Sequence, residues 1–180
     1  MLKGSDILRI ATFNIWNHES LWFEGLEAIC EEIRSISPHI LALQEVRSSV
    51  NLKSKENVAR YIADRTGYPF CIFKEHPDSP DEGLAICSKI PIIAEEAIWE
   101  TDIEEPNYCA IRIMFKYKGY KFGVTNVHLN WKSSRIRQEQ MDTVNNWIEN
   151  VSIFGDSALT STGVFPSDHY GVFADLEFDK

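Results

Sequence analysis

The sequence has no apolar run long enough to cross a bilayer, and residues 1–6 lack the charged start and long apolar stretch of a secretory signal. None of its four cysteines forms a C-x-x-C pair, and each lies among apolar neighbours. This pattern predicts buried, reduced thiols and gives no indication of a zinc cluster. We therefore expect a cytoplasmic protein without a transmembrane segment.

Basic residues are also scarce, since the sequence has 18 Lys and Arg against 27 Asp and Glu, which gives a net charge of -9. A surface this acidic repels a phosphate backbone, which argues against avid nonspecific nucleic-acid binding. It still permits a phosphorylated substrate, because a carboxylate-bound divalent cation reverses the field locally. Repeats, linkers and low-complexity segments are missing as well. We expect a single domain over residues 1–180, and the sequence leaves its oligomeric state open.

Local patterns predict the secondary structure. The predicted strands cover residues 7–15, 39–44, 70–73, 83–88, 90–99, 109–117, 120–129 and 170–178. The predicted helices cover residues 22–36, 51–65 and 133–150. Turn residues predict a loop over 76–82 and a hairpin turn at Lys118-Gly119. The opening order of strand, helix and strand indicates a layered α/β (α+β) architecture.

Two polar side chains lie where the first two predicted strands end. Asn14 belongs to the end of the first strand, and Glu45 follows the apolar strand 39–44. Taken alone, Asn14 is typical of a turn and Glu45 of a solvated strand end. A carboxylate at the carboxyl edge of a buried strand is also well placed to hold a hard cation such as Mg²⁺.

Three further candidates lie toward the C-terminus. His128 ends a predicted strand, where it is either an ordinary half-buried histidine or a donor to a phosphate oxygen. Asp168 and His169 precede the last predicted strand. A Pro-Ser-Asp turn accounts for both residues. Alternatively, Asp168 is a metal carboxylate and His169 an acid–base or phosphate-binding group.

The five candidates together are more informative than any one of them. They supply carboxylates, an amide and two imidazoles, all beside predicted strand ends. Such a set suits attack of water on a phosphoester, where a metal and positive donors stabilise the developing charge. Oxygen ligands favour Mg²⁺ or Mn²⁺ as the metal.

The order of these motifs resembles the endonuclease/exonuclease/phosphatase superfamily. The matching segments are I-A-T-F-N at 10–14, L-A-L-Q-E at 41–45, G-L-A-I-C-S at 83–88, N-V-H-L at 126–129 and S-D-H at 167–169. Arg137 and Gln140 match an R-x-x-Q helix of the family, where we expect a structural role. The resemblance implies a DNase I-like four-layer sandwich, in which helices cover the outside of two facing β-sheets.

The resemblance also implies roles for individual residues. Glu45 would be the principal metal ligand, with Asn14 and Asp168 nearby. His128 and His169 would flank the scissile phosphate, and Asn14, Asp168 and these two histidines would form the catalytic set. The implied activity is that of a magnesium-dependent phosphodiesterase or phosphatase, a hydrolase acting on a phosphoester substrate that the sequence does not identify.

The sequence departs from the family between the R-x-x-Q helix and S-D-H. Family members carry G-D-F-N there, and this chain has no such motif, so a segment expected near 150–155 is lacking and the fold would be truncated. Residues 153–156 are either a degraded G-D-F-N strand, which makes Asp156 the surviving base, or the family's penultimate strand after a deletion. We favour the second alignment. The chain is then an impaired phosphoesterase, a non-catalytic remnant that binds a ligand or partner, or the truncated product of a gene for a once-active enzyme.

Overall fold

The computed structural model describes residues 7–15, 22–50, 57–77, 79–99 and 109–147. The chain divides into two compact units, residues 1–128 and residues 129–180. The elements are β1 (Ile10–Asn14), α1 (Trp22–Ile36), β2 (Ile40–Arg47), α2 (Val58–Thr66), β3 (Phe70–His76), β4 (Ser79–Ser88), β5 (Ile92–Trp99), β6 (Cys109–Tyr117), β7 (Tyr120–Val127) and α3 (Ser134–Trp147). All but α3 belong to the first unit.

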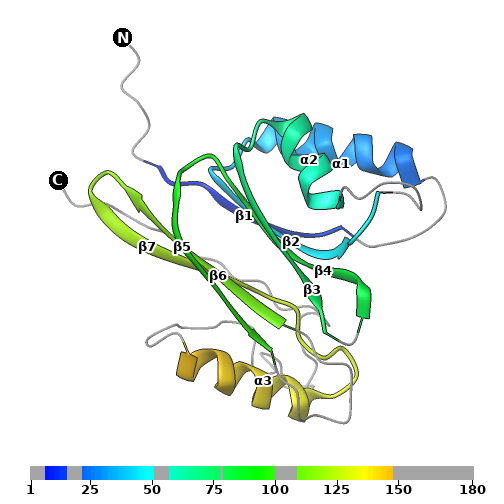
Figure 1. Ribbon diagram of the computed structural model, residues 1–180, viewed down its shortest axis with the longest axis vertical. Coiled ribbons are helices and arrows are strands. Elements are labelled where there is room, and N and C mark those ends of the chain that lie inside the picture. The colour runs from blue at the N-terminus through cyan, green and yellow to red at the C-terminus, as the bar shows by residue number, and fades with distance from the viewer. Residues whose placement is uncertain (1–6, 16–21, 51–56, 78, 100–108, 148–180) are drawn as a thin grey trace, which may run out of the picture. The chain divides into compact units, whose positions relative to one another are not determined.

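The first sheet of this unit has the strand order β1-β2-β4-β3 (Figure 1). β1 and β2 run parallel and are joined by α1, whereas β4 lies antiparallel to both β2 and β3. Because β1 and β2 are parallel, their carboxyl ends meet at one edge of the sheet, with Asn14 opposite Gln44 in the register. Residues that follow these two strands are therefore brought together.

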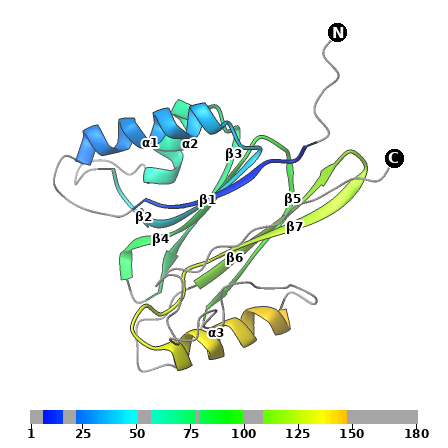
Figure 2. The same cartoon turned by 180° about the vertical axis from the view of Figure 1, so that it is seen from behind.

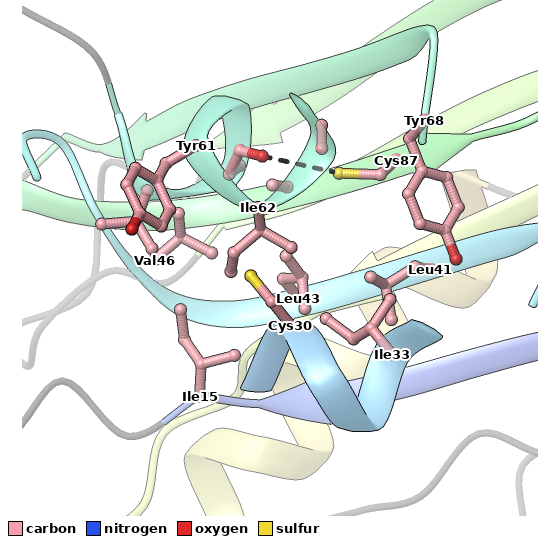
Figure 3. Packing of buried hydrophobic residues seen from close by; sticks show 14 of the residues in the cluster. Ile15, Cys30, Ile33, Leu41, Leu43, Val46, Tyr61, Ile62, Tyr68 and Cys87 are labelled. Atoms are coloured by element: carbon pink, nitrogen blue, oxygen red, sulfur yellow. Dashed lines mark hydrogen bonds between the residues drawn. The ribbon is translucent and has the colours of Figure 1, made fainter. Parts of the chain in front are cut away.

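Helices α1 and α2 lie against one face of this sheet (Figures 1 and 2). α2 begins at Asn57, whose side chain accepts a hydrogen bond from the backbone N–H of Arg60 at 2.8 Å. It ends at Gly67, which adopts a left-handed φ of 78°. Apolar side chains from both helices and the sheet form one core (Figure 3), including Ile62, which is fully buried. Each such buried side chain contributes about 1.5–3 kcal/mol to folding.

The second sheet is antiparallel, with the order β5-β6-β7. β6 and β7 form the hairpin expected from the sequence, turning at Lys118 and Gly119 with φ values of 50° and 88°. Two consecutive positive φ values match the twist of a tight two-residue hairpin, and glycine adopts them at little cost. The second sheet packs against the side of β2 and β4 that the helices leave uncovered.

The amide of Asn126 joins the two sheets. This residue of β7 is 3% exposed, and its Nδ2 donates to the carbonyl oxygens of Leu43 at 2.8 Å and Ala85 at 2.9 Å. Its Oδ1 accepts from Nε2 of Gln44 at 2.5 Å. One side chain of the second sheet is thus bonded to both central strands of the first, which fixes β7 relative to β2 and β4.

The structure confirms the mixed α/β class, with two sheets and helices, and corrects the limits of several elements. The predicted loop over 76–82 is wrong, because β3 runs to His76 and β4 begins at Ser79. An irregularity in the pairing at Glu75 and His76 lets the hairpin continue past the residues that suggested a turn. The first strand is shorter than predicted. The predicted strand at 170–178 and parts of the helices predicted over 51–65 and 133–150 lie outside the described residues.

Replacing Asn126 by alanine should lower the free energy of unfolding by about 1–3 kcal/mol, because buried polar groups of both sheets lose their partner. Urea denaturation of Asn126→Ala and of the exposed β7 variant Lys121→Ala measures this. The exposed variant should stay within about 0.5 kcal/mol of the wild type. Equal stability of all three proteins would show that the amide does not hold the sheets together.

Candidate functional site

Asn14 and Glu45 meet at the edge where β1 and β2 end. Nδ2 of Asn14 donates to Oε1 of Glu45 at 2.8 Å. The parallel register places Asn14 beside Gln44, so the contact follows from the pairing of the strands. The hydrogen bond orients one carboxylate oxygen and leaves the other oxygen of Glu45 available for a further contact.

A bulge in β2 directs the side chain of Glu45. The pairing with β4 shifts between Leu43 and Val46, and Glu45 has a φ of 55°. Leu41, Leu43 and Val46 all belong to the core beneath the helices. Strict alternation would put Glu45 on that same face, so the extra residue turns it away from the core. The predicted position of Glu45 after the strand is wrong, because Glu45 lies inside β2 at this bulge.

The positive φ of Glu45 lowers the stability of the fold locally. A residue with a Cβ in the left-handed region is less stable by about 1–2 kcal/mol than in the ordinary regions. Such strain persists where the surrounding structure imposes it, and it often occurs at functional sites. Here the strain accompanies the placement of a carboxylate at the strand edge.

His128 completes the described part of the site. It directly follows β7, and its Nε2 lies 3.8 Å from Oε1 of Glu45, with 12% and 21% of the two side chains exposed. His128 is two residues beyond Asn126, and Glu45 is two residues beyond Leu43, the carbonyl partner of Asn126. The bond between the sheets therefore also sets the separation of His128 and Glu45.

Two residues that sequence analysis missed lie beside His128. His76, at the end of β3, is 2% exposed, and its ring centroid is 5.9 Å from that of His128. Burial, with a smaller effect of His128, lowers the pKa of His76 to about 4. Glu82 of β4 joins them, since one ligand atom from each residue lies within 4.8 Å of the others. The sequence indicates neither residue as a site residue, except that Glu82 directly precedes the G-x-A-I-x-S segment.

Asp168 and His169 lie outside the described residues, as does Asp156. Their predicted roles at the site stay predictions. Of the five candidate site residues, the structure brings together Asn14, Glu45 and His128.

Arg137 and Gln140 lie in the second unit, where they support the segment leading into α3. Oε1 of Gln140 accepts from the backbone N–H of Asn130 at 2.7 Å. Nη1 of Arg137 donates to the carbonyl oxygens of Asn130 at 3.1 Å and Trp131 at 3.2 Å. Oδ1 of Asn130 accepts from two further backbone N–H groups. These contacts stabilise a turn, in keeping with the structural role expected for both side chains.

The arrangement combines an oriented carboxylate with an imidazole in a partly exposed position. Carboxylate and amide oxygens are the ligands that Mg²⁺ and Mn²⁺ prefer, so Glu45 and Asn14 fit a hard divalent cation. An imidazole beside them can donate to a phosphate oxygen. Within the described residues, no helix is both long and apolar enough to cross a membrane.

The sequence profile of the Endonuclease/Exonuclease/phosphatase family matches residues 11–170. The chain is 26% identical over 129 residues to uncharacterized protein F14F9.5 of Caenorhabditis elegans, a match covering 72% of this chain and 36% of the relative. The chain therefore spans about a third of that curated relative.

Solved structures share the fold. A functionally unknown conserved protein from Enterococcus faecalis V583 is 24% identical, with a TM-score of 0.64 over 79% of this chain and 61% of that chain. A mannosyl-6-phosphatase of Bacteroides thetaiotaomicron, Bt3783, is 17% identical, with a TM-score of 0.58 over 79% of this chain and 61% of that chain. The fold is thus DNase I-like, and the chain spans about three fifths of these structures.

Two substitutions isolate the strain at Glu45, since Glu45→Gly and Glu45→Ala both remove the carboxylate and its bond to Asn14. Only glycine relieves the positive φ. We expect Glu45→Gly to be more stable than Glu45→Ala by about 1 kcal/mol in chemical denaturation. A glycine variant no more stable than the alanine variant would show that the bulge holds no strain.

Proposed function

The chain belongs to the endonuclease/exonuclease/phosphatase family, and we propose that it is a metal-dependent phosphoesterase that hydrolyses its substrate with water. The observation that carries this proposal is the convergence of Asn14 at the end of β1, Glu45 at the bulge of β2 and His128 directly after β7. An amide-oriented carboxylate beside an imidazole supplies a cation ligand and a phosphate-binding donor in one place. These are the requirements of phosphoester hydrolysis.

Glu45 is the principal metal ligand in this proposal, with Asn14 and Asp168 contributing oxygen atoms. The fit rests on a carboxylate that the Asn14 amide orients and that remains partly exposed. Mg²⁺ or Mn²⁺ suits such a set, because both cations favour oxygen ligands. When bound, the cation neutralises charge that develops on the phosphate oxygens.

The imidazoles of His128 and His169 flank the phosphate in this proposal. His128 lies near the carboxylate of Glu45 in a position that is mostly buried, where a donor to a phosphate oxygen is worth more than in bulk water. Asp168 and His169 then provide the remaining carboxylate and an acid–base group. Asn14 keeps the carboxylate of Glu45 in place.

The proposed substrate is a phosphorylated compound of small size. The net charge of -9 opposes long-range attraction of a polyanion, so avid nonspecific nucleic-acid binding is not expected. Cations at the site reverse the field over a short distance only, which suits a compact phosphoester. The proposed location of the protein is the cytoplasm, where its cysteines stay reduced.

A second candidate function is binding without catalysis. The observation that favours it is the absence of G-D-F-N from the sequence, where the family's Asp and Asn would position the attacking water. In this alternative the site still holds a metal and a phosphate but has no secure base. Asp156 is the one residue that we propose as a replacement base.

Metal binding should depend on Glu45. Calorimetric titration of Mg²⁺ should show one weak site in the wild type and none in Glu45→Gln, because the amide lacks the negative charge that attracts a hard cation. Glu31→Gln, which removes an exposed carboxylate of α1, serves as the matched control and should bind as the wild type does. Equal binding by all three proteins would refute a site at Glu45.

Turnover should be weaker than in a family member with G-D-F-N, by about 10²–10⁴-fold if general-base assistance is lost. Hydrolysis of bis(p-nitrophenyl) phosphate with Mg²⁺ or Mn²⁺, and with EDTA as the blank, measures it. His169→Ala should abolish the residual activity. Asp156→Ala should abolish it too if Asp156 is the base, and should alter only stability if residues 153–156 are the penultimate strand.

Two outcomes decide between the candidate functions. Full turnover in the wild type that survives both substitutions would overturn the site assignment and the expected impairment. Absence of turnover in folded protein that still binds Mg²⁺ through Glu45 would establish the binding function instead.

A further inference from the structure

We propose a second cation site, formed by His76, Glu82 and His128, that selects a transition metal such as Zn²⁺ over Mg²⁺. One ligand atom from each of the three side chains lies within 4.8 Å of the other two. Metal–ligand distances of about 2.0–2.2 Å separate the ligand atoms of a tetrahedral ion by about 3.5 Å. Small changes in side-chain torsion therefore close the three ligands around one ion.

The chemistry of the three side chains sets the selectivity. Two imidazoles and one carboxylate are typical ligands of Zn²⁺ and related ions, whereas Mg²⁺ prefers oxygen ligands and its own water. Three protein ligands also leave a coordination position open, as in zinc sites that bind water or an anion. The proposed metal at Glu45 is of the opposite kind, since it has oxygen ligands only.

The backbone holds the three ligands in place. His76 and Glu82 come from adjacent strands of one sheet, and His128 follows a strand of the other. Gly83 allows β3 and β4 to approach closely, because a Cβ there would lie 2.0 Å from the carbonyl oxygen of Lys74. His76 is almost fully buried, and Glu82 and His128 are half-buried. The ligands therefore have little freedom to lose when the ion binds.

Because His128 belongs to both sites, the second cation has a consequence for turnover. His128 Nε2 lies 3.8 Å from Glu45 Oε1, so an ion on His128 withdraws that imidazole from a phosphate bound at Glu45. Zn²⁺ should thus inhibit Mg²⁺-dependent hydrolysis without competing for Glu45. This consequence rests on the proposed phosphoesterase function, whereas the cation site itself does not.

Binding tests the site independently of activity. Co²⁺, which reports tetrahedral coordination by its visible absorption, and Zn²⁺ in competition with a chromogenic chelator are the probes. The wild type should bind one equivalent, and His76→Gln and Glu82→Gln should each weaken Zn²⁺ binding by at least about 100-fold. The matched controls are Glu75→Gln, an exposed neighbour on β3, and Glu45→Gln, both of which should retain tight Zn²⁺ binding.

Circular dichroism shows whether each variant folds. If the buried His76→Gln does not fold, the half-buried Glu82→Gln decides alone. Zn²⁺ affinity that is unchanged in Glu82→Gln, or lost in Glu45→Gln, would overturn the site, as would a wild type that binds no Zn²⁺.

Kinetics then test the inhibition. Zn²⁺ should lower Mg²⁺-dependent turnover of the wild type at least about tenfold and leave turnover of Glu82→Gln unaffected. Equal inhibition of both proteins would refute the link through His128. A wild type without any turnover would count against the proposed function alone, because the binding measurements would still decide the cation site.

Discussion

The hydrogen bonds of the Asn126 amide are the interaction on which the site depends. They tie β7 to β2 and β4 through the carbonyl oxygens of Leu43 and Ala85 and through the side chain of Gln44. His128 lies two residues beyond Asn126 and Glu45 two residues beyond Leu43, so these hydrogen bonds also set the distance between His128 and Glu45. A deeply buried amide lowers the stability of the fold unless its donors and acceptor are all hydrogen-bonded. This requirement favours the one arrangement of the two sheets in which Asn126 reaches its partners.

The bulge at Glu45 shows a second constraint, in which a backbone conformation of lower stability places a carboxylate beside Asn14 and His128. Apolar side chains on both sides of the bulge stay in the core, while Gln44 and Glu45 are both directed away from it. Gln44 takes part in joining the sheets, and Glu45 faces Asn14 and His128. The extra residue of the bulge thus lets Gln44 join the two sheets while Glu45 faces the candidate site. The left-handed φ of Glu45 lowers the stability of the fold in return.

Local patterns predicted much of the fold because they depend on neighbouring residues only. The hairpin at Lys118-Gly119 and the end of α1 before Pro38 are examples. The extent of β3 and β4 was missed, because pairing between strands outweighed the turn preferences of residues 76–82. The motifs predicted Asn14, Glu45 and His128 as site residues, but not His76, since its proximity to His128 arises from the packing of two sheets.

In the function proposed here, Glu45 is the ligand of a hard divalent cation in a phosphoesterase site. Anomalous diffraction from crystals of the protein grown with Mn²⁺ tests it most directly, because the ion is located without reference to activity. We expect an anomalous peak about 2.0–2.2 Å from a carboxylate oxygen of Glu45, within reach of the side chain of Asn14. Ordered crystals with saturating Mn²⁺ and no peak at Glu45 would contradict it.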